Sequence, residues 1–171
     1  MAVEVVTFGL FLLRHTAQWA TDPEVFLASQ ARLHVGSATV GTVVLLIGSF
    51  TAYQGALSCE VGRGRRAVGW LAATALAGLV FSTNKIGEYA DLTDVTLSTN
   101  GFWFSYLFLT GLHLLHVVAG VVGFAWLTVS AARGHADEGE GLLEVQAGAV
   151  YWHLVDVVWL MLFPVLYLMH P

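Results

Sequence analysis

The chain has 171 residues, of which 57% are hydrophobic and only 11% are charged. Soluble domains carry about 25% charged residues, so most of this chain needs a solvent other than water. The net charge of −5, with one short basic run, argues against nucleic-acid binding, and the single cysteine, Cys59, excludes an intramolecular disulfide and a cysteine-rich metal site.

The hydrophobic pattern predicts a membrane protein. A helix that crosses the hydrocarbon core needs about 20 apolar residues, and five stretches meet or approach that length. With no room for a second domain, residues 1–171 are expected to form one all-α membrane domain, a bundle of five transmembrane helices. The predicted spans are Ala2–Ala20, Val35–Leu57, Val68–Ala90, Phe102–Ser130 and Gln146–Met169.

The first predicted span contains an acidic residue near its start. Glu4 stands where a cleavable signal peptide would be positively charged, so this stretch is expected to remain as a membrane helix. A carboxylate is favoured in the first turn of a helix, and capping is the simplest interpretation of Glu4. The alternatives are a proton-accepting group facing the bilayer interior and a contact with lipid or a partner subunit.

The connections between spans predict the orientation of the chain in the membrane. Arg63, Arg65 and Arg66 fall between the second and third spans, whereas the connection from the third to the fourth span contains no Lys or Arg. Basic loops remain on the cytoplasmic side. The N-terminus is therefore expected inside and the C-terminus outside.

The third span ends with a charged pair. Lys85 and Glu88 are three residues apart, which places both on one face of a helix, and Tyr89 follows them. An intrahelical ion pair beside an interfacial tyrosine is the simpler interpretation. The alternative is that these residues contact a partner subunit or a lipid headgroup.

The fourth and fifth spans carry ionisable residues at membrane depth. His113 and His116 share a face of the fourth span, and His153 and Asp156 share a face of the fifth. Because a charged group in the membrane costs about 3 kcal/mol or more, each needs a partner or a purpose. We expect the two faces to meet as one polar cluster, joined by histidine–carboxylate hydrogen bonds.

Two alternatives concern the same spans. The histidines could hold a haem or a metal, but a catalytic metal normally has three protein ligands, and the two histidines on one helical turn cannot bind opposite faces of a haem iron. No catalytic, cofactor-binding or metal-binding residue is therefore assigned. Trp152 and Trp159 are seven residues apart on one face of the fifth span, which suits a subunit contact or a lipid-facing ridge.

These motifs resemble those of one known family. Residues 111–117 resemble the Gly-x-His-x-x-His-Val signature of haem–copper oxidase subunit III, and residues 151–160 resemble the Tyr-Trp-His-Phe-Val-Asp-Val-Val-Trp run of the same family. Glu88 with Tyr89 resembles its Glu-Tyr pair, Glu144 precedes the last span as expected, and Glu4 resembles its membrane-embedded glutamate. The matches cover nearly the whole chain in order.

The resemblance implies a role without catalysis. It implies a five-helix form that lacks the family's first two helices, located in the cytoplasmic (inner) membrane of a bacterium or archaeon. In this family the subunit binds no haem or copper, holds phospholipids and packs against the catalytic subunit. The cofactors implied for that partner are haem with copper or non-haem iron. The implied partners are the catalytic subunit and membrane lipids.

Short segments narrow the resemblance further. Residues 26–33, 85–89 and 162–168 resemble the subunit-III-type protein associated with nitric oxide reductase, an accessory component of denitrification. We favour this branch, with an oxidase subunit as the close alternative. Functions of other classes are a small membrane electron carrier that binds haem or quinol, and a proton-conducting protein in which the intramembrane His and Asp relay protons.

Overall fold

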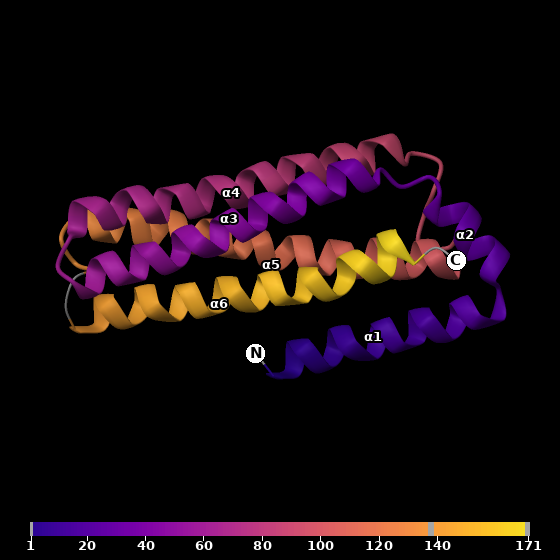
Figure 1. Ribbon diagram of the computed structural model, residues 1–171, viewed down its shortest axis with the longest axis horizontal. Coiled ribbons are helices and arrows are strands. Elements are labelled where there is room, and N and C mark those ends of the chain that lie inside the picture. The colour runs from indigo at the N-terminus through magenta and orange to yellow at the C-terminus, as the bar shows by residue number, and fades with distance from the viewer. Residues whose placement is uncertain (1, 137–138, 170–171) are drawn as a thin grey trace.

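Seven helical segments make up the described chain. The computed structural model describes the backbone of residues 2–136 and 139–169, and side chains from Val6 onward within these ranges. Four long helices, α3 to α6, run side by side in an elongated bundle (Figure 1). In chain order the segments are α1 (Ala2–Thr21), α2 (Pro23–Gln30), α3 (Val35–Glu60), α4 (Gly64–Asp91), α5 (Gly101–Ala132), α6 (Gly139–Phe163) and the π-helix η1 (Pro164–Leu168).

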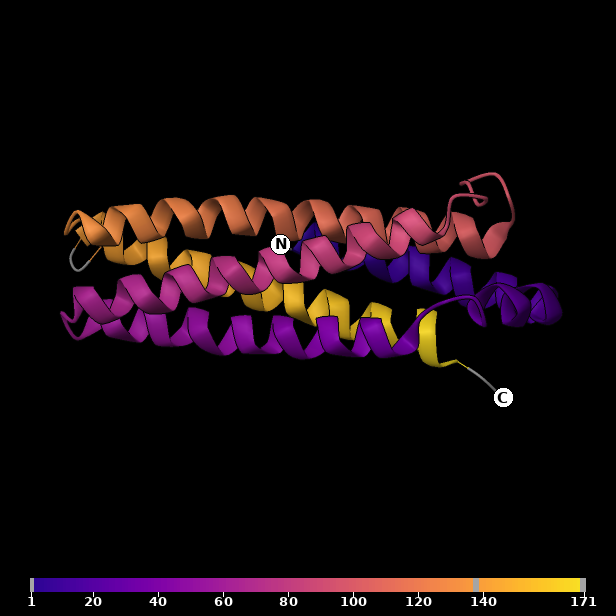
Figure 2. The same ribbon diagram turned by 90° about the horizontal axis from the view of Figure 1, so that it is seen from above.

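The four long helices form a closed ring of neighbours. α3 packs on α4, α4 on α5, α5 on α6, and α6 on α3. α1 lies beside only one half of the bundle's length, mainly against α5, and α2 caps that end (Figures 1 and 2). α6 therefore has two long neighbours, α3 and α5, and this position decides where its polar side chains point.

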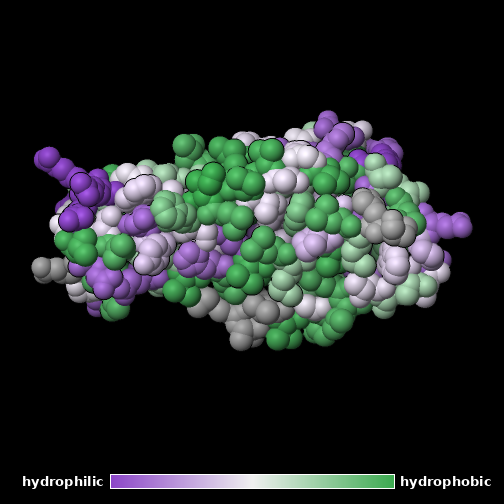
Figure 3. All heavy atoms as spheres, in the orientation of Figure 1, coloured by the Kyte–Doolittle hydropathy of each residue, from purple (hydrophilic) through white to green (hydrophobic). Residues whose placement is uncertain are grey.

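Four helices in the described chain are long and apolar enough to cross a membrane. They are α3, α4, α5 and α6 with its continuation to Leu168. On the face shown in Figure 3, hydrophobic residues cover much of the bundle's middle, and hydrophilic residues gather toward its ends. The chain is thus an all-helical membrane protein. α1 forms close to its predicted bounds but is not among the four, so the fifth span and the placement of the termini stay predictions.

Local sequence explains where several helices begin and end. Asn100 caps α5 by accepting a hydrogen bond from the backbone N–H of Trp103, at 3.0 Å. Gly62 has φ +66°, a conformation that glycine adopts readily, and it lets α3 turn directly into α4. Pro164 has no N–H to donate, and at this residue the α-helix gives way to η1.

Two contacts join the end of the bundle that α2 covers. Arg32 donates to the Asp94 carboxylate at 2.6 Å, and this bond lowers the pKa of Asp94 below its usual value. Gln30, buried in α2, donates through its side-chain amide to the Leu166 carbonyl at 3.0 Å. This second bond ties α2 to η1.

Trp152 fills the centre of the ring. Its indole is fully buried and lies over glycines from three different helices: a Cβ at Gly48 of α3, Gly78 of α4 or Gly120 of α5 would come within 3.0, 2.7 and 3.1 Å of the ring, respectively. Small residues let helices approach closely in membranes, and here they also make space for one large ring.

This packing predicts that the Gly78→Ala substitution destabilises the bundle. The new methyl group would meet Val121 and Trp152, and overpacking of this kind costs about 1–3 kcal/mol. The control is Gly87→Ala on the same helix, where a Cβ meets no atom within 4 Å. Thermal unfolding of the detergent-solubilised protein should show a lower Tm for Gly78→Ala only. Equal Tm values for both variants would contradict the central position of Trp152.

Candidate functional site

The Lys85–Glu88 pair is the most polar feature of the interior. Both side chains come from the last turns of α4, and their Nζ and Oε2 atoms are 3.1 Å apart. Lys85 is only 2% exposed and Glu88 only 5%. The intrahelical ion pair predicted from their spacing is confirmed, but it lies inside the bundle rather than at its surface.

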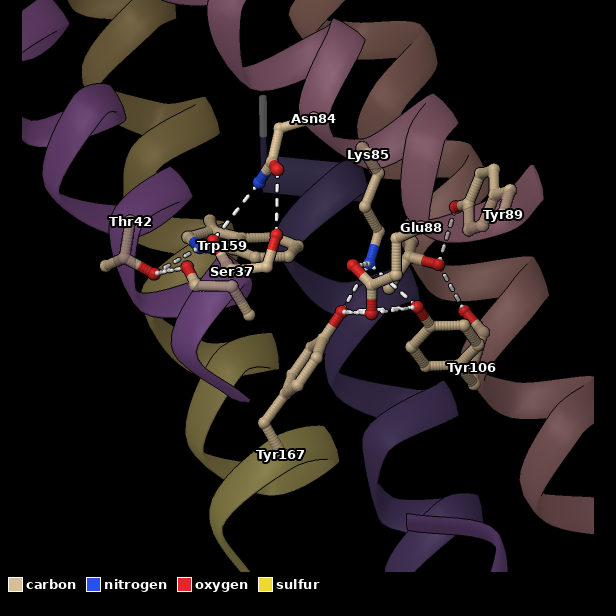
Figure 4. A network of polar contacts seen from close by, with 11 residues as sticks. Ser37, Thr42, Asn84, Lys85, Glu88, Tyr89, Tyr106, Trp159 and Tyr167 are labelled. Atoms are coloured by element: carbon tan, nitrogen blue, oxygen red, sulfur yellow. Dashed lines mark hydrogen bonds and ion pairs between the residues drawn. The ribbon is translucent and has the colours of Figure 1, made fainter. Parts of the chain in front are cut away.

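Two tyrosines from other segments complete this pair (Figure 4). Lys85 donates to Glu88, to the Tyr106 hydroxyl of α5 at 2.9 Å and to the Tyr167 hydroxyl of η1. Both tyrosines donate to Glu88 Oε1, at 2.7 and 2.9 Å. The ammonium group thus uses its three donors, and both carboxylate oxygens accept. Each buried charge is fully compensated.

Aromatic rings surround the ammonium group. Lys85 Nζ lies 4.7 Å from the centre of the Tyr106 ring, 5.1 Å from that of Tyr167, 5.4 Å from that of Tyr89 and 5.5 Å from that of Trp159. A cation within about 6 Å of an aromatic face is attracted by the ring's quadrupole. α4, α5, α6 and η1 therefore all contribute to holding one positive charge.

Burial corrects the predicted surface contacts. Lys85, Glu88, Trp152 and Trp159 are each no more than 5% exposed within this single chain, so they are wrong as lipid or subunit contacts. The reason is that each finds its partners inside the bundle. Tyr89 is half-buried, and its hydroxyl lies 2.7 Å from that of Thr110. The side chain of Glu4 lies outside the described part of the structure.

The two α5 histidines lie near α1 and the apolar side of α6. His113 is fully buried, stacks on Trp159 with centroids 5.0 Å apart, and meets the edge of Phe81. Neither of its nitrogens has a hydrogen-bond partner among the described residues. His116 Nδ1 lies 2.8 Å from the Leu112 carbonyl. Both imidazoles line a cavity of about 10 Å³ with four apolar side chains: Phe8, Leu154, Val155 and Val158.

The polar side of α6 faces α3. His153 Nδ1 hydrogen bonds with the Ser49 hydroxyl at 2.5 Å, and Trp159 donates to Thr42 at 2.9 Å. Asp156 is buried, and neither carboxylate oxygen has a hydrogen-bond partner of normal geometry among the described residues.

The sequence predicted that the two histidines of α5 would hydrogen bond with His153 and Asp156 of α6 in one cluster. This pairing is wrong. His153 turns toward Ser49 of α3, while His113 and His116 meet apolar residues of α6. The physical reason is that α6 presents different faces to its two neighbours. Among the described side chains, those of residues 6–136 and 139–169, no three His, Cys, Asp or Glu converge in a way that could hold a metal ion.

Several residues of these contacts were not predicted from the sequence. Tyr106, Tyr167 and Ser49 sit in hydrophobic stretches, with no charged neighbour in sequence that would mark them. The signal available is general: a buried tyrosine hydroxyl needs a hydrogen-bond partner, and a buried ion pair needs additional donors. Neither rule says which tyrosine meets which pair.

Fold and interior together define the class of protein, a multi-pass helical membrane protein with a hydrogen-bonded ion pair buried inside the bundle. Residues 32–170 match the family model of cytochrome c oxidase subunit III. The chain belongs to the cytochrome c oxidase subunit III family.

Curated relatives are similar along most of the chain. Cytochrome c oxidase subunit 3 of Synechocystis sp. is 32% identical over 171 residues, covering 98% of this chain and 70% of the relative. Cytochrome c oxidase subunit 3 of Thermostichus vulcanus is 34% identical, covering 77% and 65%. Cytochrome bo(3) ubiquinol oxidase subunit 3 of Pseudomonas aeruginosa is 30% identical, covering 92% and 73%. The matches span roughly two thirds to three quarters of these relatives.

The buried charges predict a strong double-mutant effect. Lys85→Met or Glu88→Gln alone leaves the other charge buried without its counter-ion and should cost about 3–5 kcal/mol. The double variant should cost less than the sum of the two. Unfolding of the purified protein in mixed detergent measures all three free energies. Arg133→Met, which removes an exposed cation, is the control and should stay within about 0.5 kcal/mol of wild type. Strict additivity of Lys85→Met and Glu88→Gln would contradict the ion pair.

A second cycle tests where the polar face of α6 points. Ser49→Ala and His153→Ala should be coupled by more than about 0.5 kcal/mol, because their side chains share a hydrogen bond. Asp156→Ala and His113→Ala should add, because no hydrogen bond joins them. The same unfolding assay measures both cycles. Coupling of the second pair alone would support the arrangement expected from the sequence instead.

Proposed function

We propose that this chain is a non-catalytic subunit of a membrane respiratory haem–copper complex, supporting assembly and stable turnover of the catalytic subunit. The observation that carries the proposal is the family match, which runs from residue 32 to residue 170 and so includes α3 to α6. Haem, with copper or non-haem iron, belongs to the partner subunit in this proposal and not to this chain.

The positions of the polar groups favour a structural, non-catalytic role for this chain. The buried ion pair and the histidines bond or pack within the chain, each in a different contact between helices. The outer faces of the long helices are apolar, as on α3, where Val40, Ile47 and Phe50 are more than half exposed. Such faces suit contact with lipid or with the membrane helices of a larger partner.

The proposed arrangement is the five-helix form, with α1 as the additional membrane helix. The α3–α4 and α5–α6 turns lie at the same end of the bundle (Figure 1), and they carry Arg63, Arg65, Arg66 and Arg133. By the positive-inside rule this end faces the cytoplasm, which places the N-terminus inside and the C-terminus outside. The proposed location is the cytoplasmic membrane of a bacterium or archaeon.

Bound phospholipid forms part of the proposal. An open groove of about 350 Å³ runs between α5 and α6, and its lining is almost entirely apolar. Small residues of both helices line it, among them Gly120, Gly123, Ala147 and Gly148. A groove of this shape along a membrane helix suits an acyl chain.

The partner can belong to either of two branches. Residues 26–33, 85–89 and 162–168 favour the nitric-oxide-reductase-associated branch, in which the chain would serve denitrification. The relatives named above are subunits of a cytochrome c oxidase or a ubiquinol oxidase, which favours the oxidase branch. The catalytic chain that accompanies this protein decides between the branches.

Co-purification tests the proposed function. A tagged chain, extracted from its native membrane in mild detergent, should bring down a larger haem-containing protein, identified by mass spectrometry and by its Soret band. The Soret band should stay with that partner when the two are separated. Membranes with the untagged chain are the control.

Two results would overturn the proposal in favour of another class. A Soret band retained by the isolated chain would indicate a haem-binding electron carrier built on His113, His116 or His153. Proton flux through liposomes that contain only this chain, lost in Asp156→Asn, would indicate a proton-conducting protein.

A further inference from the structure

The turn between α3 and α4 concentrates positive charge at one end of the bundle. Arg63, Arg65 and Arg66 lie within four residues, and all three side chains are exposed. Gly62, at φ +66°, closes the turn, and Arg63 N–H bonds back to the Ser58 carbonyl at 2.8 Å. The turn is therefore tight, and the arginines are held close together by the backbone.

These arginines have no counter-ion within the described chain. The ion pairs found among the described residues are Arg32–Asp94 and Lys85–Glu88, and neither involves the α3–α4 turn. Glu60, the last residue of α3, is exposed and forms no ion pair with them. Three guanidinium groups at the end of a membrane bundle thus remain available to an external anion.

Two shallow, open hollows on the surface are lined by these side chains. One, of about 430 Å³, is lined by residues 62–66. The other, of about 490 Å³, shares Arg65 and Arg66 and continues down α4 over Gly69, Trp70 and Ala73. The second hollow is therefore basic at its outer end and apolar at its inner end, and Gly69 leaves space because a Cβ there would meet no atom.

The inner end of this hollow leads to the apolar surface of α4. Trp70 is half-buried and packs edge-on against Phe50 of α3, with centroids 6.1 Å apart. Leu76 and Val80 continue the face of Ala73 at helical spacing and are 60% and 44% exposed. Tryptophan favours the level of the lipid headgroups, which places the arginines at phosphate level and the apolar strip beside the acyl chains.

We infer that this turn is a binding site for the phosphate group of an anionic phospholipid, such as phosphatidylglycerol. Guanidinium groups bind phosphate oxygens through paired hydrogen bonds, and the N-terminal N–H groups of the 28-residue α4, which has no side-chain cap, add a positive partial charge. The apolar continuation explains why a lipid, and not a free anion, is the ligand. The inference requires only that the chain crosses a membrane, so it holds whichever catalytic partner the chain has.

Lipid titration of the full-length protein tests this site. The purified chain in neutral detergent is titrated with short-chain phosphatidylglycerol or phosphatidylcholine, or with inorganic phosphate, and binding is followed by native mass spectrometry and by the rise in Tm. Phosphatidylglycerol should bind and raise Tm, and the other two should not. Arg65→Gln/Arg66→Gln should weaken its binding by about 30-fold, since each arginine near an anionic surface strengthens attraction by about fivefold.

A matched variant separates a site from general charge. Arg14→Gln/Arg32→Gln removes the same net charge from residues that lie outside both hollows, and its affinity for phosphatidylglycerol should stay within twofold of wild type. Equal weakening by both double variants would mean attraction to net charge only. Equal binding of phosphatidylcholine would mean apolar contact only, and binding of inorganic phosphate at the same concentration would mean a free-anion site. Each of these results overturns the inference.

Discussion

A lysine and a glutamate buried among membrane helices impose the strictest constraint on this structure. An unpaired charge at such a position is costly, and even a pair is tolerated only when the remaining donors and acceptors are satisfied. Lys85 and Glu88 meet that condition only because Tyr106 and Tyr167 arrive from α5 and η1. The ion pair is local to α4, but its compensation requires three segments to be in place at once. The two buried charges are therefore fully compensated only when α4, α5 and η1 are packed together.

The shape of the interior follows a second constraint that acts near Trp152. Three glycines from three helices leave the space that this indole occupies, so the ring of helices closes around it with little freedom to shift. Gly55 of α3 similarly admits Leu71 of α4. Side chains used in this way cannot also serve a partner. Contacts with lipid or another subunit must come from the exposed apolar faces and from the charged turns. Separate residues thus serve internal packing and external contacts, as suits a structural subunit.

Sequence predicted the parts of this structure that depend on local properties. Span length and apolarity are local, and the predicted bounds of α3, α4 and α5 lie within four residues of those observed. The Lys85–Glu88 pair was predicted because helical spacing alone brings the two together. α2 was missed because eight residues give too short a pattern, and Tyr167 because it lies 79 residues from Glu88 in sequence. The partner of His153 was predicted wrongly because chain order indicates that α5 is a neighbour of α6. It does not indicate that α3 packs on the other side of α6.

The observed positions of His113 and His153 also bear on the role of the intramembrane histidines. A chemical centre needs its ligands or acid–base groups to converge on one point, within hydrogen-bond or metal-ligand distance of a shared substrate. Among the described residues they diverge: His153 bonds to Ser49 of α3, while His113 stacks on Trp159 and lines a small cavity with Val155 and Val158 of α6. Polar groups distributed among separate helix contacts give each contact its own register, because sliding one helix would break a specific bond. A subunit that supports a catalytic neighbour needs this fixed geometry more than it needs a reactive group of its own.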